Sequence, residues 1–218
     1  MDLLPEPDKY LTSAYDTERR FVSYWYQINE VLSVTHGNVL EVGIGNGFVS
    51  DYLRARGVKL TTVDIDGRLK PDVVANLTDL PFEASSFDVV ACYEVLEHLP
   101  WETIPRAIAE LNRVTASHSL VSLPDSERKY RVFIQFHRGS KAFRRVFVIP
   151  RIWKTKLECD GEHCWEIGVV GYPLCKINEE FERGNFEIEQ TLIPFNNPYH
   201  RFFRLRKLEE DKGTPPRR

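Results

Sequence analysis

The spacing of apolar and polar residues predicts strands and helices that alternate along the first part of the chain. Residues 12–34 are predicted to form a helix, because apolar and aromatic side chains recur every three or four positions. Two further helices are predicted over 48–56 and 101–114, and strands over 38–42, 59–64, 72–77, 87–95 and 120–123. Strands that alternate with helices are typical of a doubly wound, mostly parallel α/β sheet.

The alternation ends after Leu123. An irregular insertion is predicted up to Pro173, followed by a helix over 177–183 that ends at Gly184. Two strands over 186–195 and 199–206 flank an Asn-Asn-Pro turn, which predicts a C-terminal antiparallel hairpin and a sheet of seven strands. The predicted parts are a helical cap (1–36), an α/β core (37–124), a basic and aromatic insertion (125–175), a helix and hairpin that complete the core (176–208) and a disordered tail (209–218).

The composition excludes several classes of protein. The 218 residues are 42% hydrophobic and 28% charged with a net charge of −3, which fits one globular domain and excludes a disordered or collagen-like chain. No run approaches the ~18 to 20 apolar residues that span a bilayer, and the acidic segment Met1–Tyr10 is unlike a signal peptide. A cytoplasmic location is therefore predicted. The cysteines are expected to be reduced thiols there: Cys92, Cys159, Cys164 and Cys175.

A glycine-rich loop and a later acid provide the first candidate for a binding site. The run Glu41-Val-Gly43-Ile-Gly45-Asn-Gly47 lies where the first strand should meet the first helix of the core, and glycines there allow a ligand to approach the backbone. Phe48 stands where the dinucleotide fingerprint needs its third glycine, which argues against NAD. Asp64 ends the second strand, where a carboxylate can accept both ribose hydroxyls of an adenosine-containing ligand.

Three later segments follow the glycine loop and Asp64 in the order and spacing found in a known family of such sheets: Asn76–Phe82, Ser86–Val90 and Tyr93–Leu99. Together with the loop and Asp64, they make the stretch from Gly37 to Pro124 resemble the class I S-adenosylmethionine-dependent methyltransferases, in particular the small-molecule enzymes related to the ubiquinone and menaquinone methyltransferases. The resemblance implies a Rossmann-like methyltransferase fold, an enzyme, and S-adenosylmethionine as cofactor.

The resemblance also implies roles for individual residues. The methionyl part of the cofactor would be held by Glu41, Gly43, Gly45 and Gly47. The ribose would be bound by Asp64, and Ile65 would pack on adenine. Asn76 and Leu77 stand at the adenine edge, where the family usually has an acidic and a small residue; the Asn oxygen can still accept a hydrogen bond. Cys92 and Tyr93, at the end of the fourth predicted strand, would line the reacting methyl group.

Methyl transfer from a sulfonium is an in-line displacement that depends largely on near-attack geometry, so a dedicated base is optional. A hydroxyl acceptor would need a proton acceptor, for which the candidates are His98, His163 and Glu166. His163, Trp165 and Glu166 are also expected to face the acceptor, with a core position as the alternative for Trp165.

Metal binding is weighed separately and is not predicted. Glu94, Glu97 and His98 would share a face of a helical turn and could bind a divalent cation, and similar ubiquinone O-methyltransferases and small-RNA 2′-O-methyltransferases use one. The same letters occur in metal-free relatives, so no metal is expected. A zinc site is disfavoured because no C-x-x-C pair occurs among its possible ligands, which are Cys159, His163, Cys164 and Cys175.

The insertion contains a strongly basic segment. Ten Lys or Arg residues and no Asp or Glu lie between Arg128 and Lys156, interleaved with aromatic and aliphatic side chains. This segment is expected to meet an anionic, partly apolar acceptor or an anionic membrane surface on the substrate side. The alternatives are an amphipathic helix pair with solvated charges and a single-stranded nucleic acid, although the D/N-P-P-Y motif of base methylation is missing after the fourth strand.

The predicted function is methyl transfer from S-adenosylmethionine to an oxygen or nitrogen atom of a small or lipid-linked, anionic acceptor. Two alternatives stay open, a non-catalytic S-adenosylmethionine-binding module and an RNA methyltransferase. The sequence predicts no oligomeric state.

Overall fold

The computed structural model describes residues 9, 10, 12, 14–35, 37–137, 139, 141–149, 156, 157, 159 and 163–209. The predicted tail beyond Glu209 and part of the basic segment lie outside these residues. Within the described chain, no helix combines the length and apolarity that crossing a bilayer requires.

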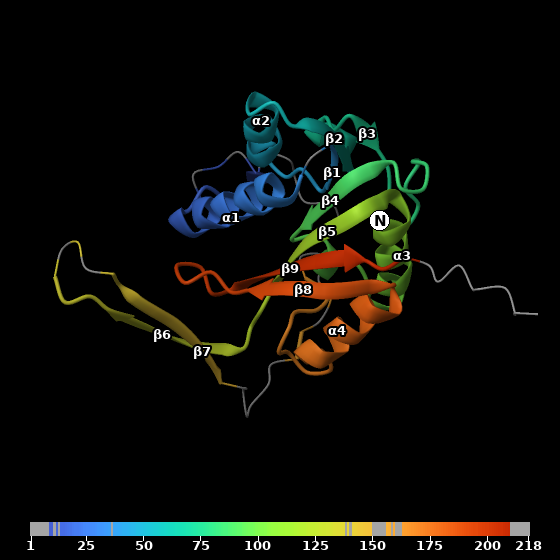
Figure 1. The fold of residues 1–218 in the computed structure, drawn as a ribbon. Coiled ribbons are helices and arrows are strands. Elements are labelled where there is room, and N and C mark those ends of the chain that lie inside the picture. The colour runs from blue at the N-terminus through green and yellow to red at the C-terminus, as the bar shows by residue number, and fades with distance from the viewer. Residues whose placement is uncertain are drawn as a thin grey trace, which may run out of the picture.

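A seven-stranded sheet in the order β3-β2-β1-β4-β5-β9-β8 forms the centre of the molecule (Figure 1). Strands β1 to β5 are parallel to one another, whereas β9 is antiparallel to both β5 and β8. The predicted fold is thus confirmed. The elements that build it are α1 (Glu18–Val34), β1 (Asn38–Val42), α2 (Phe48–Ala55), β2 (Lys59–Asp64), β3 (Val73–Val74), β4 (Phe87–Tyr93), α3 (Ile104–Val114), β5 (Thr115–Pro124), α4 (Leu174–Arg183), β8 (Phe186–Leu192) and β9 (His200–Lys207).

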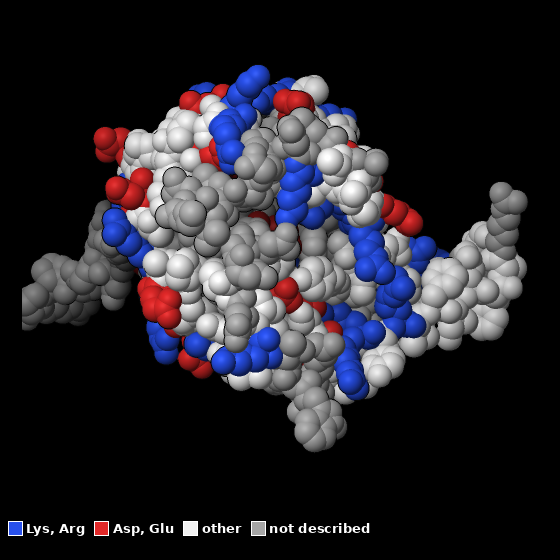
Figure 2. All heavy atoms as spheres, turned by 180° about the vertical axis from the view of Figure 1, so that it is seen from behind, with Lys and Arg blue, Asp and Glu red and all other residues white. Residues whose placement is uncertain are grey.

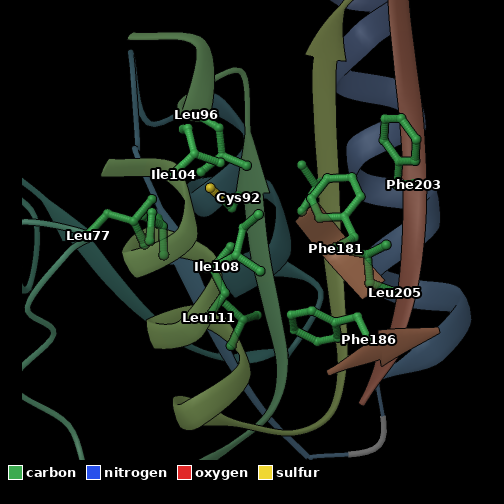
Figure 3. Close-up of a cluster of buried hydrophobic side chains, with 14 of the residues drawn as sticks. Leu77, Cys92, Leu96, Ile104, Ile108, Leu111, Phe181, Phe186, Phe203 and Leu205 are labelled. Carbon is green, nitrogen blue, oxygen red and sulfur yellow. The ribbon is translucent and has the colours of Figure 1, made fainter. Parts of the chain in front are cut away.

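Helices cover both faces of the sheet, and each face has its own apolar core. On one face α3 and α4 pack on the strands, with Ile108, Leu111 and Phe181 fully buried among them (Figure 3). On the other face α1 and α2 bury Val31 and Leu53 against the sheet. Burial from both sides explains why most residues of β1 and β4 are apolar.

Several element boundaries differ from those predicted. Helix α1 begins at Glu18, because the Thr17 hydroxyl caps its first turn by accepting the N–H of Arg20 at 3.3 Å. Strand β3 has only two residues, since the chain turns at Asn76, whose side-chain oxygen accepts the Thr78 N–H at 2.9 Å. Strand β4 ends at Tyr93, because Glu94 takes a left-handed backbone conformation with φ of 55°.

The insertion is not irregular at its start, and it is not a helix pair. Strands β6 (Arg128–Ile134) and β7 (Phe143–Ile149) form an antiparallel hairpin in a separate two-stranded sheet. Figure 1 shows this hairpin projecting away from the central sheet. Cations are interleaved with apolar residues in both segments, and the alternation of a strand places successive side chains on opposite faces.

One expectation about the cysteines is wrong. Cys159 and Cys164 are joined by a disulfide across five positions, whereas Cys92 and Cys175 are free thiols. The loop that brings the two sulfur atoms together has no regular pattern in the sequence, so the pairing could not be predicted from the spacing. The pairing also removes two ligands from the zinc site considered above.

Candidate functional site

The glycine loop lies at the carboxyl edge of the sheet, between β1 and α2. Gly43, Gly45 and Gly47 have φ values of 79°, 53° and 76°, in the left-handed region that favours glycine. Helix α2 begins directly after Gly47, so its first N–H groups point toward the same edge. Since β1 is flanked by β2 and β4, this edge is the switch point at which doubly wound sheets bind ligands.

Asp64 ties the end of β2 to the glycine loop. Its Oδ2 accepts the Ile44 N–H and its Oδ1 accepts the Asp66 N–H, both at 2.9 Å. The half-buried carboxylate therefore contacts the glycine loop directly. Ile65 follows it with half of its surface exposed, which leaves an apolar side chain available to a flat ring.

A cavity of about 430 Å³ opens beside this loop. The segment before α1 borders it: the Tyr10 ring meets the Tyr15 ring edge to face at 5.2 Å, and the Asn46 side chain donates to Asp16 at 3.3 Å. Burial, with Tyr15 and Asp64 nearby, raises the pKa of Tyr10 to about 12. The cavity is lined by Tyr10, Ile44, Gly45, Asn46, Gly47, Ser50, Asp51, Arg54, Thr62, Arg68, Leu69 and Lys70.

Glu41 lies beneath the loop rather than in the cavity. Its side chain is buried and its Oε2 accepts the Ser50 hydroxyl at 2.6 Å, so it joins β1 to α2. Burial raises the pKa of Glu41 to about 7, although the Ser50 hydrogen bond lowers it in part. A direct contact with the cofactor would need this carboxylate to leave its pocket, so the structure places it as a support of the loop.

The side chains expected at the adenine edge and at the methyl group are either used within a turn or buried in a core. Asn76 uses its side-chain oxygen in the turn with Thr78, and Leu77 is buried in the core next to α3. The Cys92 thiol is fully enclosed by core side chains (Figure 3), so it cannot line the methyl group. The Tyr93 ring is buried on the opposite face, where its hydroxyl donates to the Gln27 carbonyl at 3.3 Å. For these two strand residues, only the backbone remains available to a ligand.

Three potential metal ligands converge after β4. Glu97 and His98 lie on the short turn Leu96–His98, and His163 comes from the distant loop after the hairpin. One ligand atom from each lies within 4.8 Å of those of the other two. The backbone N–H of Cys164 donates to the Glu97 carbonyl at 2.7 Å, which fixes the distant loop against the turn.

Glu97 is the unusual member of this cluster. Its side chain is fully buried, and neither carboxylate oxygen has a hydrogen-bond partner within the described chain. Burial, reinforced by the nearby negative charge of Glu94, raises the pKa of Glu97 well above its usual range. An orphaned buried carboxylate costs free energy unless a proton or a cation neutralises it.

Glu166 holds His163 in place. Its Oε1 accepts from His163 Nδ1 and from the Tyr199 hydroxyl, each at 2.7 Å, and its Oε2 accepts from Ser126. Burial alone would raise the pKa of Glu166, but these hydrogen bonds outweigh it and the pKa is lowered. With Nδ1–H donating to a carboxylate, the Nε2 lone pair of His163 is left to accept a proton or bind a cation.

Glu94 does not share a helical face with Glu97, which corrects the predicted arrangement. Its left-handed backbone turns the side chain toward β5 and β9, where Ser122 donates to Oε1 at 2.7 Å and His200 Nε2 lies 3.3 Å from Oε2. Trp165 is likewise a core residue, 1% exposed, with its indole N–H donating to the Leu99 carbonyl.

The sequence did not predict three residues that contact the acids at this edge. Ser126 and Tyr199 donate to Glu166, and His200 lies beside Glu94. These three residues come from the start of the insertion and from the terminal hairpin, far along the chain from Glu97. A turn signal near Tyr199 was visible in the sequence, but no spacing rule connects it to the carboxyl edge of β4.

Residues 40–123 match the family model described as "Methyltransferase domain". This span runs from β1 into β5, so it contains the glycine loop, Asp64 and the Leu96–His98 turn.

Two curated relatives resemble part of the chain. A probable S-adenosylmethionine-dependent methyltransferase of Mycobacterium tuberculosis (strain CDC 1551 / Oshkosh) is 29% identical over 122 residues, which cover 49% of this chain and 44% of the relative. The ubiquinone biosynthesis O-methyltransferase of Pseudomonas putida (strain ATCC 700007 and equivalents) is 32% identical over 88 residues, covering 34% and 38%. The chain thus spans less than half the length of these relatives.

Among solved structures, magnesium protoporphyrin IX methyltransferase of Synechocystis, crystallised with bound SAH, shares the fold with a TM-score of 0.56. The identity is 14%, and the match covers 87% of this chain and 83% of that chain. At this identity the likeness concerns the fold.

Proposed function

We propose that the chain is a class I S-adenosylmethionine-dependent methyltransferase, as the match of residues 40–123 and the two relatives support. It transfers the methyl group of S-adenosylmethionine to an oxygen or nitrogen atom of a small or lipid-linked, anionic acceptor. The observation that supports the cofactor best is the link between Asp64 and the glycine loop. Through this link the Asp64 carboxylate, which would bind the ribose, lies beside three glycines and a helix N-terminus at one edge of the sheet.

Two parts of the carboxyl edge of the sheet would bind the cofactor and the acceptor separately. The loop and Asp64 would hold the methionyl part and the ribose, with Ile65 against adenine. The acceptor would lie toward the Leu96–His98 turn, since the ends of β1 and β4 are neighbours in the sheet. There His163 or His98 would take the proton of a hydroxyl acceptor, and Glu166 would orient His163 through its Nδ1–H.

Calorimetry with S-adenosylhomocysteine tests the cofactor. One equivalent is expected to bind per chain, and NAD is expected not to bind, because Phe48 replaces the glycine that a dinucleotide requires. Asp64→Ala should weaken binding by about 1.5 to 3 kcal/mol, the range for hydrogen bonds to a charged group. The control is Glu83→Ala, an exposed acid before β4, at the opposite edge of the sheet. Tight NAD binding without heat from S-adenosylhomocysteine would refute the cofactor assignment.

A divalent cation at Glu97, His98 and His163 is a second proposal about the same site, although no metal is predicted from the sequence. The residues fit a cation, because the orphaned Glu97 carboxylate faces two imidazoles and Glu166 fixes His163 as second-sphere carboxylates do for metal-bound histidines. Bound there, a divalent cation would polarise and orient the acceptor group.

Titration of dialysed protein with magnesium, manganese and zinc chlorides tests this site independently of activity. Wild type and the exposed-acid control Glu102→Gln are expected to bind one ion per chain, whereas Glu97→Gln is expected to bind none. The metal-free Glu97→Gln protein should melt no lower than wild type, since the variant removes a buried group that lacks a partner. A wild-type protein that gives no heat with any of the three ions would leave Glu97 as a protonated acid instead.

A further inference from the structure

The hairpin of β6 and β7 has two unlike faces. Alternation along the strands and the cross-strand register place eight side chains on what we name the outer face: Arg128, Tyr130, Val132, Ile134, Phe143, Arg145, Phe147 and Ile149. The inner face consists of Lys129, Arg131, Phe133, Arg144, Val146 and Val148. Six of the eight outer residues are apolar, against three of the six inner residues.

The inner face is turned toward the body of the protein. Lys129 Nζ lies 2.6 Å from the buried carboxylate of Asp125. Arg131 donates to the Phe195 carbonyl at 3.3 Å, and the Phe133 ring lies 6.5 Å from the Phe195 ring. These contacts fix the direction in which the outer face points.

The outer face lacks a partner within the described chain. None of its side chains packs in either core, and about half of the surface of Tyr130, Phe147 and Ile149 is exposed. Phe136, just beyond β6, is 90% exposed. An isolated two-stranded hairpin is marginally stable in water, so an apolar face on such a hairpin calls for a surface that covers it.

Charge indicates what kind of surface this is. The described residues of 128–149 include six Lys or Arg and no Asp or Glu, although the whole chain has a net charge of −3. In Figure 2 the β6–β7 hairpin extends to the right. Its described residues are mainly white, and blue spheres gather where the hairpin meets the body of the protein. Exposed aromatic and aliphatic side chains flanked by cations are the composition that binds anionic membrane interfaces.

We infer that the outer face of the β6–β7 hairpin docks on an anionic lipid bilayer, with Tyr130, Ile134, Phe143, Phe147 and Ile149 inserted at the headgroup level. A second copy of this chain fits less well, because stacking two outer faces would bring Arg128 and Arg145 of one copy against like charges of the other. A single-stranded nucleic acid also fits less well, since Val132, Ile134 and Ile149 have no ring on which a base could stack.

The position of the hairpin gives this surface a consequence for the site. Strand β6 starts two residues after Ser126, which donates to the carboxylate that holds His163. A bilayer on the outer face would therefore lie next to the acceptor side of the cluster. Taken with the proposed function, on which this last step rests, an acceptor with a lipid tail would reach the site from the membrane.

Vesicle co-sedimentation tests the surface without reading activity. Wild type is expected to bind phosphatidylcholine vesicles that contain phosphatidylglycerol and to bind pure phosphatidylcholine at least about ten-fold more weakly, in line with the attraction of several surface cations. Phe147→Ser should lower binding to the anionic vesicles at least about ten-fold, as expected for losing a buried aromatic side chain. The matched control Val148→Ser, its neighbour on the inner face, should stay within about two-fold of wild type.

Two further variants test the surface in case Phe147→Ser disrupts the fold of the hairpin. Phe147→Trp should retain vesicle binding, since Trp suits the membrane interface, and Arg145→Glu should lower binding about ten-fold on anionic vesicles and hardly at all on neutral ones. All variants should bind S-adenosylhomocysteine as wild type does. Three outcomes would each overturn the inference: no binding of wild type to anionic vesicles, an equal loss of binding in Val148→Ser, or a preference of the protein for an RNA homopolymer or for self-association over vesicles. Failure of methyl transfer alone would count against the proposed function and not against the membrane surface.

Discussion

Gly43 and Gly57 have nearly the same backbone conformation, with φ values of 79° and 81°, but their surroundings differ. A Cβ atom on Gly43 would overlap the Cγ2 atom of Val95, whereas one on Gly57 would meet no atom within 4 Å. At Gly43 the left-handed conformation and the close approach of β4's following residues both require glycine.

Substitution of these two glycines should separate the two requirements. Gly57→Ala is expected to lower the free energy of unfolding by about 1 to 2 kcal/mol, the penalty of a left-handed residue. Gly43→Ala should lower it by about 1 to 3 kcal/mol more, as overpacking does. Urea titration measures both changes.

The Val95 contact provides the check. Adding Val95→Ala to Gly43→Ala should recover most of the extra loss and leave the conformational penalty. Equal destabilisation by Gly43→Ala and Gly57→Ala would show that β1's loop relaxes to admit a methyl group.

At the scale of elements, an ion triad fastens the start of the hairpin to the sheet. The buried carboxylate of Asp125, at the end of β5, lies 2.7 Å from Arg201 of β9 and 2.6 Å from Lys129 of β6. All three side chains are less than a tenth exposed, so each depends on the others for neutralisation.

Asp125→Ala should therefore be severely destabilising. It leaves two cations buried without a counter-charge, and the expected loss is about 3 to 5 kcal/mol in the free energy of unfolding. The matched control is Glu187→Ala, which breaks the half-exposed pair of Glu187 with Arg206 and should cost less than about 1 kcal/mol. Similar losses in the two variants, measured by urea titration, would mean that water reaches the triad.

The elements of the α/β core were predictable because the apolar residues of each element follow one simple pattern. Apolar positions at helical spacing marked α1 and α3. Short, mostly apolar segments that contain Val marked β1 and β4, which are buried on both faces. The hairpin was missed because apolar and basic residues are mixed on both of its faces, so neither strand shows a clean alternation. The period of two was hidden by the charges.

The site divides in the same way. The glycine loop and Asp64 are consecutive along one β-α-β unit, so local spacing predicts their meeting. His163 reaches Glu97 from the insertion, and Tyr199 reaches Glu166 from the terminal hairpin. Such long-range contacts leave no local pattern in the sequence. Burial of the Cys92 thiol was equally hidden, because a strand covered on both faces does not reveal which face a residue occupies.

At the scale of the whole molecule, buried acids should make stability depend on pH. The pKa of Glu41 is about 7 in the folded protein, against 4.5 for a glutamate surrounded by water, as in the unfolded chain. A raised carboxyl pKa means that the folded protein holds this proton to a higher pH than the unfolded chain does. The contribution of Glu41 to stability is therefore fully present below pH 4.5 and is lost as the pH rises through about 7.

Glu41→Gln should remove this dependence. The free energy of unfolding of wild type should fall by roughly 3 kcal/mol more than that of the variant between pH 4.5 and pH 8, at 1.36 kcal/mol per pKa unit. Glu83→Gln, an exposed control, should follow wild type at every pH. Parallel stability profiles for wild type and Glu41→Gln would show that Glu41 is solvated in the folded protein.

The antiparallel strand β9 lies inside the sheet, between β5 and β8, rather than at its edge. On a translating ribosome, β1 to β5 emerge first, and the backbone groups of β5 that later bind β9 have no partner until residues 200–207 have been made. The nascent chain must therefore keep an open strand edge through the synthesis of the hairpin and α4. This edge is where a chaperone would be needed and where premature release of the chain would lead to aggregation.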